Sequence, residues 1–190
     1  MSKKKNEQKH IPTKIGSKKS YYPDYLVIPG YNGKEYEFEN LYNVGHLISE
    51  LKKLSIRNNP LLSLITVRPI YEACKNLMLK EGLLDDNDSS TRNLKDAVIK
   101  IKENILKEDR NSLTKLCKKD DKNGGLSYHT TLNTFRNTNF GSDVEISNVF
   151  IHRLEEKVET PENIKRYLQN AILFTVIVDR YVNLKRKSST

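Results

Sequence analysis

The segment of residues 59–82 constrains the fold of this chain more than any other stretch. It reads NPLLSLITVRPIYEACKNLMLKEG, with Asn59 as a capping residue, Pro60 at the first helical position and Gly82 at the end, which are ordinary signals for the start and the end of a helix. Between these signals almost no face of the helix is polar. Because a helix that is apolar nearly all round is a buried one, we expect a helical protein whose other elements pack around residues 59–82.

Charged residues inside this segment predict a buried polar network. Arg68 and Glu72 lie one helical turn apart, and charges in a core are costly unless they are paired. Asn133, from a later polar stretch, is the third predicted member. Pro69 cannot donate to the carbonyl group of Ile65, which predicts a kink or a substitute donor there. The alternative is that these polar groups line a functional pocket.

Apolar residues at spacings of three and four predict further helices. These cover residues 41–56, 91–108, 111–119, 127–137, 143–156 and 160–184. The assignment of residues 143–156 is open to a strand, because Val149, Phe150 and Ile151 also suit one. The acidic loop at residues 85–90 lacks the central glycine and the closing glutamate of a calcium loop, so we expect it to cap the helix that follows.

The residues before the helices favour a short extended arm or hairpin. Asn32-Gly33 is a two-residue turn signal, and Tyr36 and Phe38 alternate with glutamates after it. Tyrosines such as Tyr25 would anchor the arm to the core, or alternatively stack on bases. The predicted organisation is a disordered basic tail (1–20), an arm or hairpin (21–39), a helical bundle domain (40–184) and a basic C-terminal tail (185–190).

The formal net charge of +9 is concentrated at the two ends. Residues 1–20 hold seven lysines against one glutamate, residues 185–187 add three cations, and residues 21–184 contain equal numbers of basic and acidic side chains. Flexible cationic segments attract polyanions through counterion release, so we predict contact with RNA or DNA. The alternative is that both ends are only solubilising. The predicted nucleic-acid-binding residues are Lys3, Lys4, Lys5, Lys9, Lys14, Lys18, Lys19, Lys185, Arg186 and Lys187.

Other classes of protein receive little support. No apolar run approaches the ~20 residues that span a bilayer, and the longest, residues 171–178, predicts a buried helix. Cys74 and Cys117 are too few for a disulfide framework, and with no signal peptide we expect a reduced, cytoplasmic protein. A glycine-rich phosphate loop, cysteine–histidine metal spacing and a serine nucleophile motif are all missing from the sequence, so no cofactor or metal is predicted.

Two short motifs and the final helix carry a family resemblance. VRPIYE at residues 67–72, a lysine-rich helix, LNTFRN at residues 132–137 and a last helix opened by Thr160-Pro161 together resemble HEPN-like domains over about residues 41–184. The resemblance implies an up-and-down helical bundle that is often dimeric and is frequent in toxin–antitoxin and phage-defence systems. Catalytic members of that family are metal-independent ribonucleases that use an arginine with a histidine further along the same helix.

The catalytic pattern of that family is not met here. The positions after Arg136 that should hold the histidine are Phe140, Gly141 and Ser142. His129 precedes Arg136 by two helical turns and would share its face in reversed order. We therefore expect a non-catalytic binding or assembly module, a homodimer, with a protein partner in a defence complex and with basic tails on nucleic acid. The alternatives are a metal-independent ribonuclease that uses His129 and Arg136, and a structural subunit of a larger protein–RNA complex.

Overall fold

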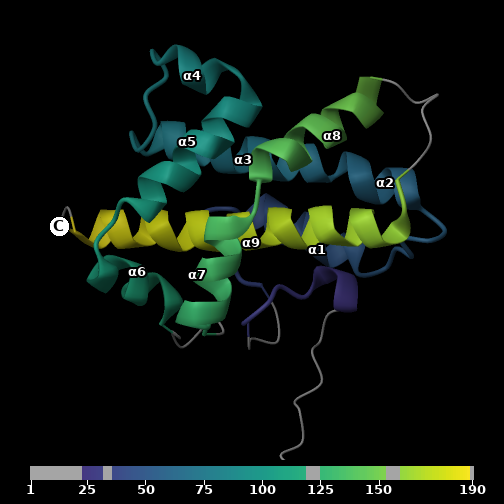
Figure 1. Ribbon diagram of the computed structural model, residues 1–190, viewed down its shortest axis with the longest axis horizontal. Coiled ribbons are helices and arrows are strands. Elements are labelled where there is room, and N and C mark those ends of the chain that lie inside the picture. Colours follow the sequence, from purple (N-terminus) through teal and green to yellow (C-terminus); the bar gives the residue numbers. More distant parts are fainter. Residues whose placement is uncertain (1–22, 32–35, 119–124, 153–158, 189–190) are drawn as a thin grey trace, which may run out of the picture.

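The computed structural model describes residues 23–31, 36–118, 125–152 and 159–188, and most of these residues are helical (Figure 1). Within those ranges there is no strand, and an isolated antiparallel bridge joins Tyr31 to Leu126. The predicted all-α fold class is therefore confirmed. The helices are η1 (Asp24–Leu26, 3-10), α1 (Tyr42–Leu51), α2 (Pro60–Ile65), α3 (Val67–Lys80), α4 (Ser89–Arg92), α5 (Leu94–Leu106), α6 (Arg110–Cys117), α7 (Tyr128–Asn137), α8 (Phe140–His152) and α9 (Pro161–Ser188).

Some predicted features lie outside the described residues. They are the basic segment of residues 1–20, the Asn32-Gly33 turn of the predicted hairpin, and residues 153–156 at the end of the helix predicted over 143–156. The ambiguity in that last segment is resolved where it is described, because Val149 and Phe150 lie in α8 and are helical.

The centre of the fold is α9, which runs through the middle of the molecule (Figure 1). Thr160 accepts a hydrogen bond from the amide of Asn163 at 3.3 Å and so caps its first turn. Residues 171–179 are buried without interruption, and α9 packs against η1, α2, α3, α6, α7 and α8. The expectation that other elements surround residues 59–82 is therefore wrong in part. Although α3 lies against α9, the longer run of apolar residues in α9 takes the central position.

The segment predicted to hold a kink or a substitute donor near Pro69 is interrupted at Thr66, between α2 and α3. Pro69 is the third residue of α3, where a backbone N–H would have no partner inside the helix, so the proline costs no hydrogen bond there. At the other end Gly82 has φ +66°, and the amide of Leu83 donates to Met78 O at 2.9 Å. This is the glycine-terminated helix end that the sequence predicts.

Polar residues divide the next predicted helix and cap its pieces. The carboxylate of Asp88, in the acidic loop, accepts from the amide of Ser90 at 2.9 Å, which confirms the predicted capping role. Asn93 then ends α4 and accepts from the amide of Lys95 at 3.0 Å, so the helix predicted over 91–108 is α4 followed by α5.

Tyrosines attach the described residues before α1 to the helices. The hydroxyl of Tyr36 donates to Leu26 O at 2.6 Å and accepts from the amide of Ile28 at 3.1 Å. The hydroxyl of Tyr25 donates to Leu51 O at 3.0 Å. These contacts agree with the expected anchoring role of the tyrosines.

Candidate nucleic-acid interface

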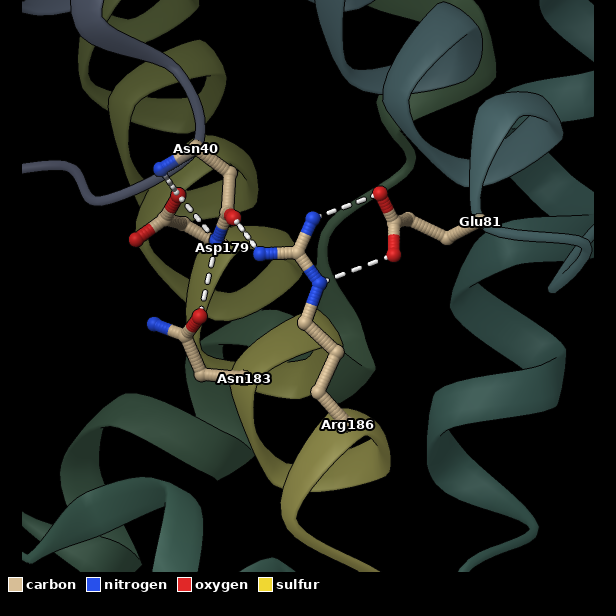
Figure 2. Close-up of polar contacts among 5 residues, drawn as sticks. All are labelled: Asn40, Glu81, Asp179, Asn183 and Arg186. Carbon is tan, nitrogen blue, oxygen red and sulfur yellow. Dashed lines mark hydrogen bonds and ion pairs between the residues drawn. The ribbon is translucent and has the colours of Figure 1, made fainter. Parts of the chain in front are cut away.

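The cations predicted to form a C-terminal tail belong to the last turns of α9, so the boundary placed at residue 185 is wrong. Lys185 Nζ lies 2.6 Å from Glu108 Oε1, and 5.3 Å from the ring centroid of Tyr181. Arg186 donates to both carboxylate oxygens of Glu81, at 2.8 and 2.6 Å (Figure 2). Of the three cations, these internal contacts leave Lys187 without a partner among the described residues.

The contacts of Arg186 belong to a polar cluster that joins three parts of the chain (Figure 2). Arg186 also donates to Asn40 Oδ1 at 2.5 Å, and Asn40 donates to Asn183 Oδ1 at 2.8 Å. The carboxylate of Asp179, 2% exposed, accepts from the backbone amides of Asn40 and Glu39 at 2.9 and 3.1 Å. Desolvation raises the pKa of Asp179, while the two amides oppose that rise. The cluster therefore ties the segment before α1 to α9 and has a structural explanation.

The predicted buried network of Arg68, Glu72 and Asn133 is only partly correct. Arg68 Nε donates to Glu72 Oε1 at 2.8 Å, but their side chains are 30% and 44% exposed. Arg68 lies on the side of α3 that faces α8. This side of α3 reaches the protein surface, so the pair is not buried. Its other partner is Asn148 in α8, which accepts from Arg68 Nη1. Asn133 is exposed on α7 and accepts from Arg136 at 3.5 Å instead.

His129 and Arg136 both lie exposed on α7. Seven residues apart, they share a face of the helix and are separated by about 10.5 Å of helical rise. The His129 ring packs edge-on against Tyr128 at 5.5 Å. In the part of the chain that the structure describes, no hydrogen bond joins His129 to Arg136. The two predicted catalytic candidates therefore lie on one face of α7, but they are not hydrogen-bonded to each other.

Arg136 lines a pocket of about 410 Å³ between α5 and the start of α8. Lys102 and Glu103 of α5 line it as well. The ammonium of Lys102 donates to Thr138 O at 2.7 Å and lies 5.7 Å from the ring centroid of Phe140. Burial lowers the pKa of Lys102. The pocket therefore combines one exposed and one partly buried cation.

A second pocket, of about 470 Å³, lies further along the contact between α5 and α8. Arg68, Arg92 and Lys95 line it together with Glu145 and Asn148. Lys95 Nζ lies 2.5 Å from Glu145 Oε1, and this contact raises the pKa of Lys95. We call this pocket the α3–α5–α8 pocket.

The two pockets lie on either side of a close contact between the helices. Gly141 of α8 lines the first pocket, and a Cβ placed on it would be 3.0 Å from Ile99 Cδ1 and 3.2 Å from Lys95 Cγ. A Cβ at this position would have to push the side chains of Ile99 and Lys95 aside by a few tenths of an ångström, so Gly141 favours the close helix spacing at the seam. We call the cations along the seam the α5–α8 cationic surface: Arg68, Arg92, Lys95, Lys102 and Arg136.

A buried carboxyl group that sequence reasoning missed lies inside the helices. Asp143 of α8 is 5% exposed, and its Oδ2 accepts from Asn170 Nδ2 at 2.9 Å and from the hydroxyl of Tyr71 at 3.3 Å. Burial raises the pKa of Asp143 to about 6, although Asn170, Tyr71 and the positive charge of Arg166 oppose the rise. Asp143 lines neither pocket along the seam, so we assign it a structural role.

Among the residues that the structure describes, no three histidine, cysteine, aspartate or glutamate side chains gather in a way that could hold a metal ion. Nor does any described helix combine the length and the apolar character required to cross a bilayer. Comparisons of the chain with protein-family models, with curated proteins and with solved structures found no match.

Proposed function

We propose that this chain is a non-catalytic nucleic-acid-binding module. The observation that carries the proposal is the distribution of charge: residues 1–20 hold seven lysines against one glutamate, while residues 21–184 are neutral overall. A cationic segment of this kind releases counterions from a polyanion when it binds, and affinity then depends steeply on salt. The α5–α8 cationic surface supports the proposal, because it offers positive charge on the folded body as well.

The two ends of the chain are not equivalent in this proposal. Lys185 and Arg186 already have carboxylate partners in Glu108 and Glu81. A phosphate would have to displace those carboxylates before it gained either cation. By the same criterion Arg68 and Lys95 in the seam are paired, with Glu72 and Glu145. We therefore assign most of the binding to residues 1–20 and to the seam cations that have no carboxylate partner among the described residues, which are Arg92, Lys102 and Arg136, with Lys187 as a minor contributor.

Salt dependence of binding tests this proposal. Labelled single-stranded RNA is titrated with the full chain, with a chain lacking residues 1–20, and with a chain in which the seven lysines are glutamine. The glutamine variant keeps the segment length, so it separates charge from chain length. Each lost phosphate contact should reduce the slope of log K against log salt by about 0.7 on a single strand, up to about 5 for all seven. Binding that is insensitive to salt, or equal in all three proteins, would contradict the proposal.

A metal-independent ribonuclease is the second candidate, because His129 and Arg136 are exposed on one face of α7. A neutral histidine could accept the ribose hydroxyl proton while an arginine neutralises the phosphate. The assay is RNA cleavage in EDTA by wild type, His129→Ala and Arg136→Ala. His46→Ala is the matched control, since His46 is exposed on α1. Cleavage that survives both substitutions would exclude this site.

The finer assignments are also proposals. We propose that the helices form a HEPN-like up-and-down bundle that works as a homodimer in the cytoplasm, within a phage-defence or toxin–antitoxin assembly. The helical fold supports this only at the level of fold class. Light scattering after gel filtration would test the dimer, and a monomeric mass across micromolar concentrations would refute it. A stable mass above the monomer without nucleic-acid binding would instead favour a structural subunit of a larger complex.

A further inference from the structure

We propose that the α3–α5–α8 pocket is a phosphate-binding site, and that its donors hold one phosphate group. The inference rests on the proposed function where that phosphate belongs to nucleic acid. It adds a specific site on the folded body to the diffuse attraction of residues 1–20. Three elements supply the site: α3 contributes Arg68, α8 contributes Asn148, and the residues around the start of α5 contribute Arg92 and Lys95.

The hydrogen-bonding groups that remain in the pocket are mainly donors. Glu72 takes the Nε donor of Arg68, and Asn148 Oδ1 takes one Nη1 donor, so further N–H groups of the guanidinium are left. Because the oxygen of Asn148 already accepts from Arg68, its remaining polar group is the NH₂ donor. No described residue accepts a hydrogen bond from the Arg92 guanidinium, which is exposed at the pocket. Such a set of donors matches the oxygen atoms of a phosphate.

The arrangement of Arg68 favours a fixed ligand geometry. Contacts to Glu72 on one side and Asn148 on the other hold the guanidinium plane between α3 and α8. An arginine held in this way loses little conformational freedom when it binds, and its Nη2 group and its remaining Nη1 hydrogen are left to donate to a phosphate. Lys95 is held by Glu145 at 2.5 Å but retains two further donors on its ammonium.

The charge of the pocket favours an anionic ligand, and its size suits a small molecule. Three cations and one carboxylate line the pocket, so a metal cation would be repelled and an anion attracted. Its volume of about 470 Å³ lies in the ~300–1,000 Å³ range of small-molecule sites. Leu94 and Val144 contribute its apolar surface, which leaves room for a sugar or a base beside the phosphate.

Two sources share this phosphate chemistry, a phosphodiester of a nucleic-acid strand and the monoester of a free nucleotide. We therefore use two probes: a short single-stranded RNA without terminal phosphates, and AMP. The variants are Arg92→Gln, Lys95→Gln and the double variant. Arg110→Gln is the matched control, because Arg110 is also an exposed arginine at a helix end, but lies on α6, on the other side of α9 from α3 and α8 (Figure 1).

All variants should unfold at nearly the wild-type temperature, because Arg92 is exposed and the Lys95–Glu145 pair lies at the surface, where ion pairs contribute little. The double variant should bind RNA at least tenfold more weakly, and its salt slope should fall by about 0.7, which corresponds to the one phosphate that the site holds. Arg110→Gln should match wild type in both measurements.

Each outcome decides between the proposals. If RNA binds wild type and the double variant equally, the phosphate site is overturned while nucleic-acid binding stands. If AMP binds wild type and not the double variant, but RNA binds neither, the site is upheld for free nucleotides and the proposed function fails. If neither probe binds wild type, both proposals are overturned.

Discussion

Replacement of Asp143 by asparagine should stabilise the protein at neutral pH. The carboxyl group of Asp143 is buried, with the hydroxyl of Tyr71 and the amide of Asn170 as donors to Oδ2. The ring of Tyr71 in turn packs on the rings of Phe140 and Phe174, with centroids 6.3 and 5.2 Å away. An ionised carboxylate is poorly solvated in this aromatic surrounding, whereas a neutral amide of the same size can keep hydrogen bonds to both partners.

The magnitude follows from the pKa of Asp143, which burial raises from 3.8 to about 6. At about 1.36 kcal/mol for each pKa unit, the folded state is stabilised by roughly 3 kcal/mol when the group is protonated, relative to when it is ionised. Between pH ~4 and ~6 the folded protein binds more protons at Asp143 than the unfolded chain does. This stability is therefore fully present below pH ~4 and is lost as the pH rises through about 6.

Urea unfolding of wild type and Asp143→Asn at pH 4.5, 5.5, 6.5 and 7.5 measures the effect. The asparagine variant should be more stable by up to about 3 kcal/mol at pH 7.5, and this advantage should shrink by about 2 kcal/mol at pH 4.5. The comparison cancels the titration of the other carboxylates. Asp96→Asn, at an exposed position in α5, is the control for the loss of a surface carboxyl group. A difference between wild type and Asp143→Asn that stays constant with pH would refute the reasoning.

Two substitutions and one labelling experiment test other parts of the structure. Gly82→Ala should lower the free energy of unfolding, measured in urea, by about 1–2 kcal/mol, because φ is +66° at this position. A Cβ there would meet no atom within 4 Å, so only the backbone strain changes. Asp179→Ala should lower the melting temperature, since the backbone amides of Glu39 and Asn40 would lose a charged acceptor, and hydrogen bonds to charged groups contribute about 1.5–3 kcal/mol each. An unchanged melting temperature would count against these bonds, of which Figure 2 shows those to Asn40. Burial raises the pKa of Cys74 to about 12 and that of Cys117 to about 11. Both thiols should therefore react with a disulfide reagent at pH 8 only after urea is added. Fast reaction in the native protein would contradict this prediction.

Local sequence signals predicted the helix ends well, because those ends depend on neighbouring residues. Gly82, the acidic loop before α4 and the Thr160-Pro161 start of α9 each act within one turn of the chain. The break at Thr66 was less predictable. Pro69 signals that the helix must be interrupted, but the chain can satisfy this by a kink or by a new helix start, and packing selects between them.

The tertiary partners of charged side chains could not be predicted in the same way. Asp143 meets Tyr71 and Asn170 only because α3, α8 and α9 pack together, and no spacing in the sequence links the three. The α3–α5–α8 pocket was missed for the same reason. Arg68 pairs with Glu72 one turn away, as predicted, but its link to Asn148 requires that α8 lie against α3.

The value of a cation for nucleic-acid binding depends on its partner in the folded protein, and not on its charge alone. Arg186 looks free in the sequence, yet it is bound to Glu81, which lies 105 residues earlier and is only 17% exposed. If RNA bound Arg186, Glu81 would be left with a poorly solvated charge. The free-energy cost of that unpaired charge would reduce the gain from the phosphate contact. Arg92 has no such partner among the described residues, so a phosphate that binds it gains the full contact. Substitution of Arg186 should consequently reduce stability more than RNA binding, and substitution of Arg92 should do the reverse.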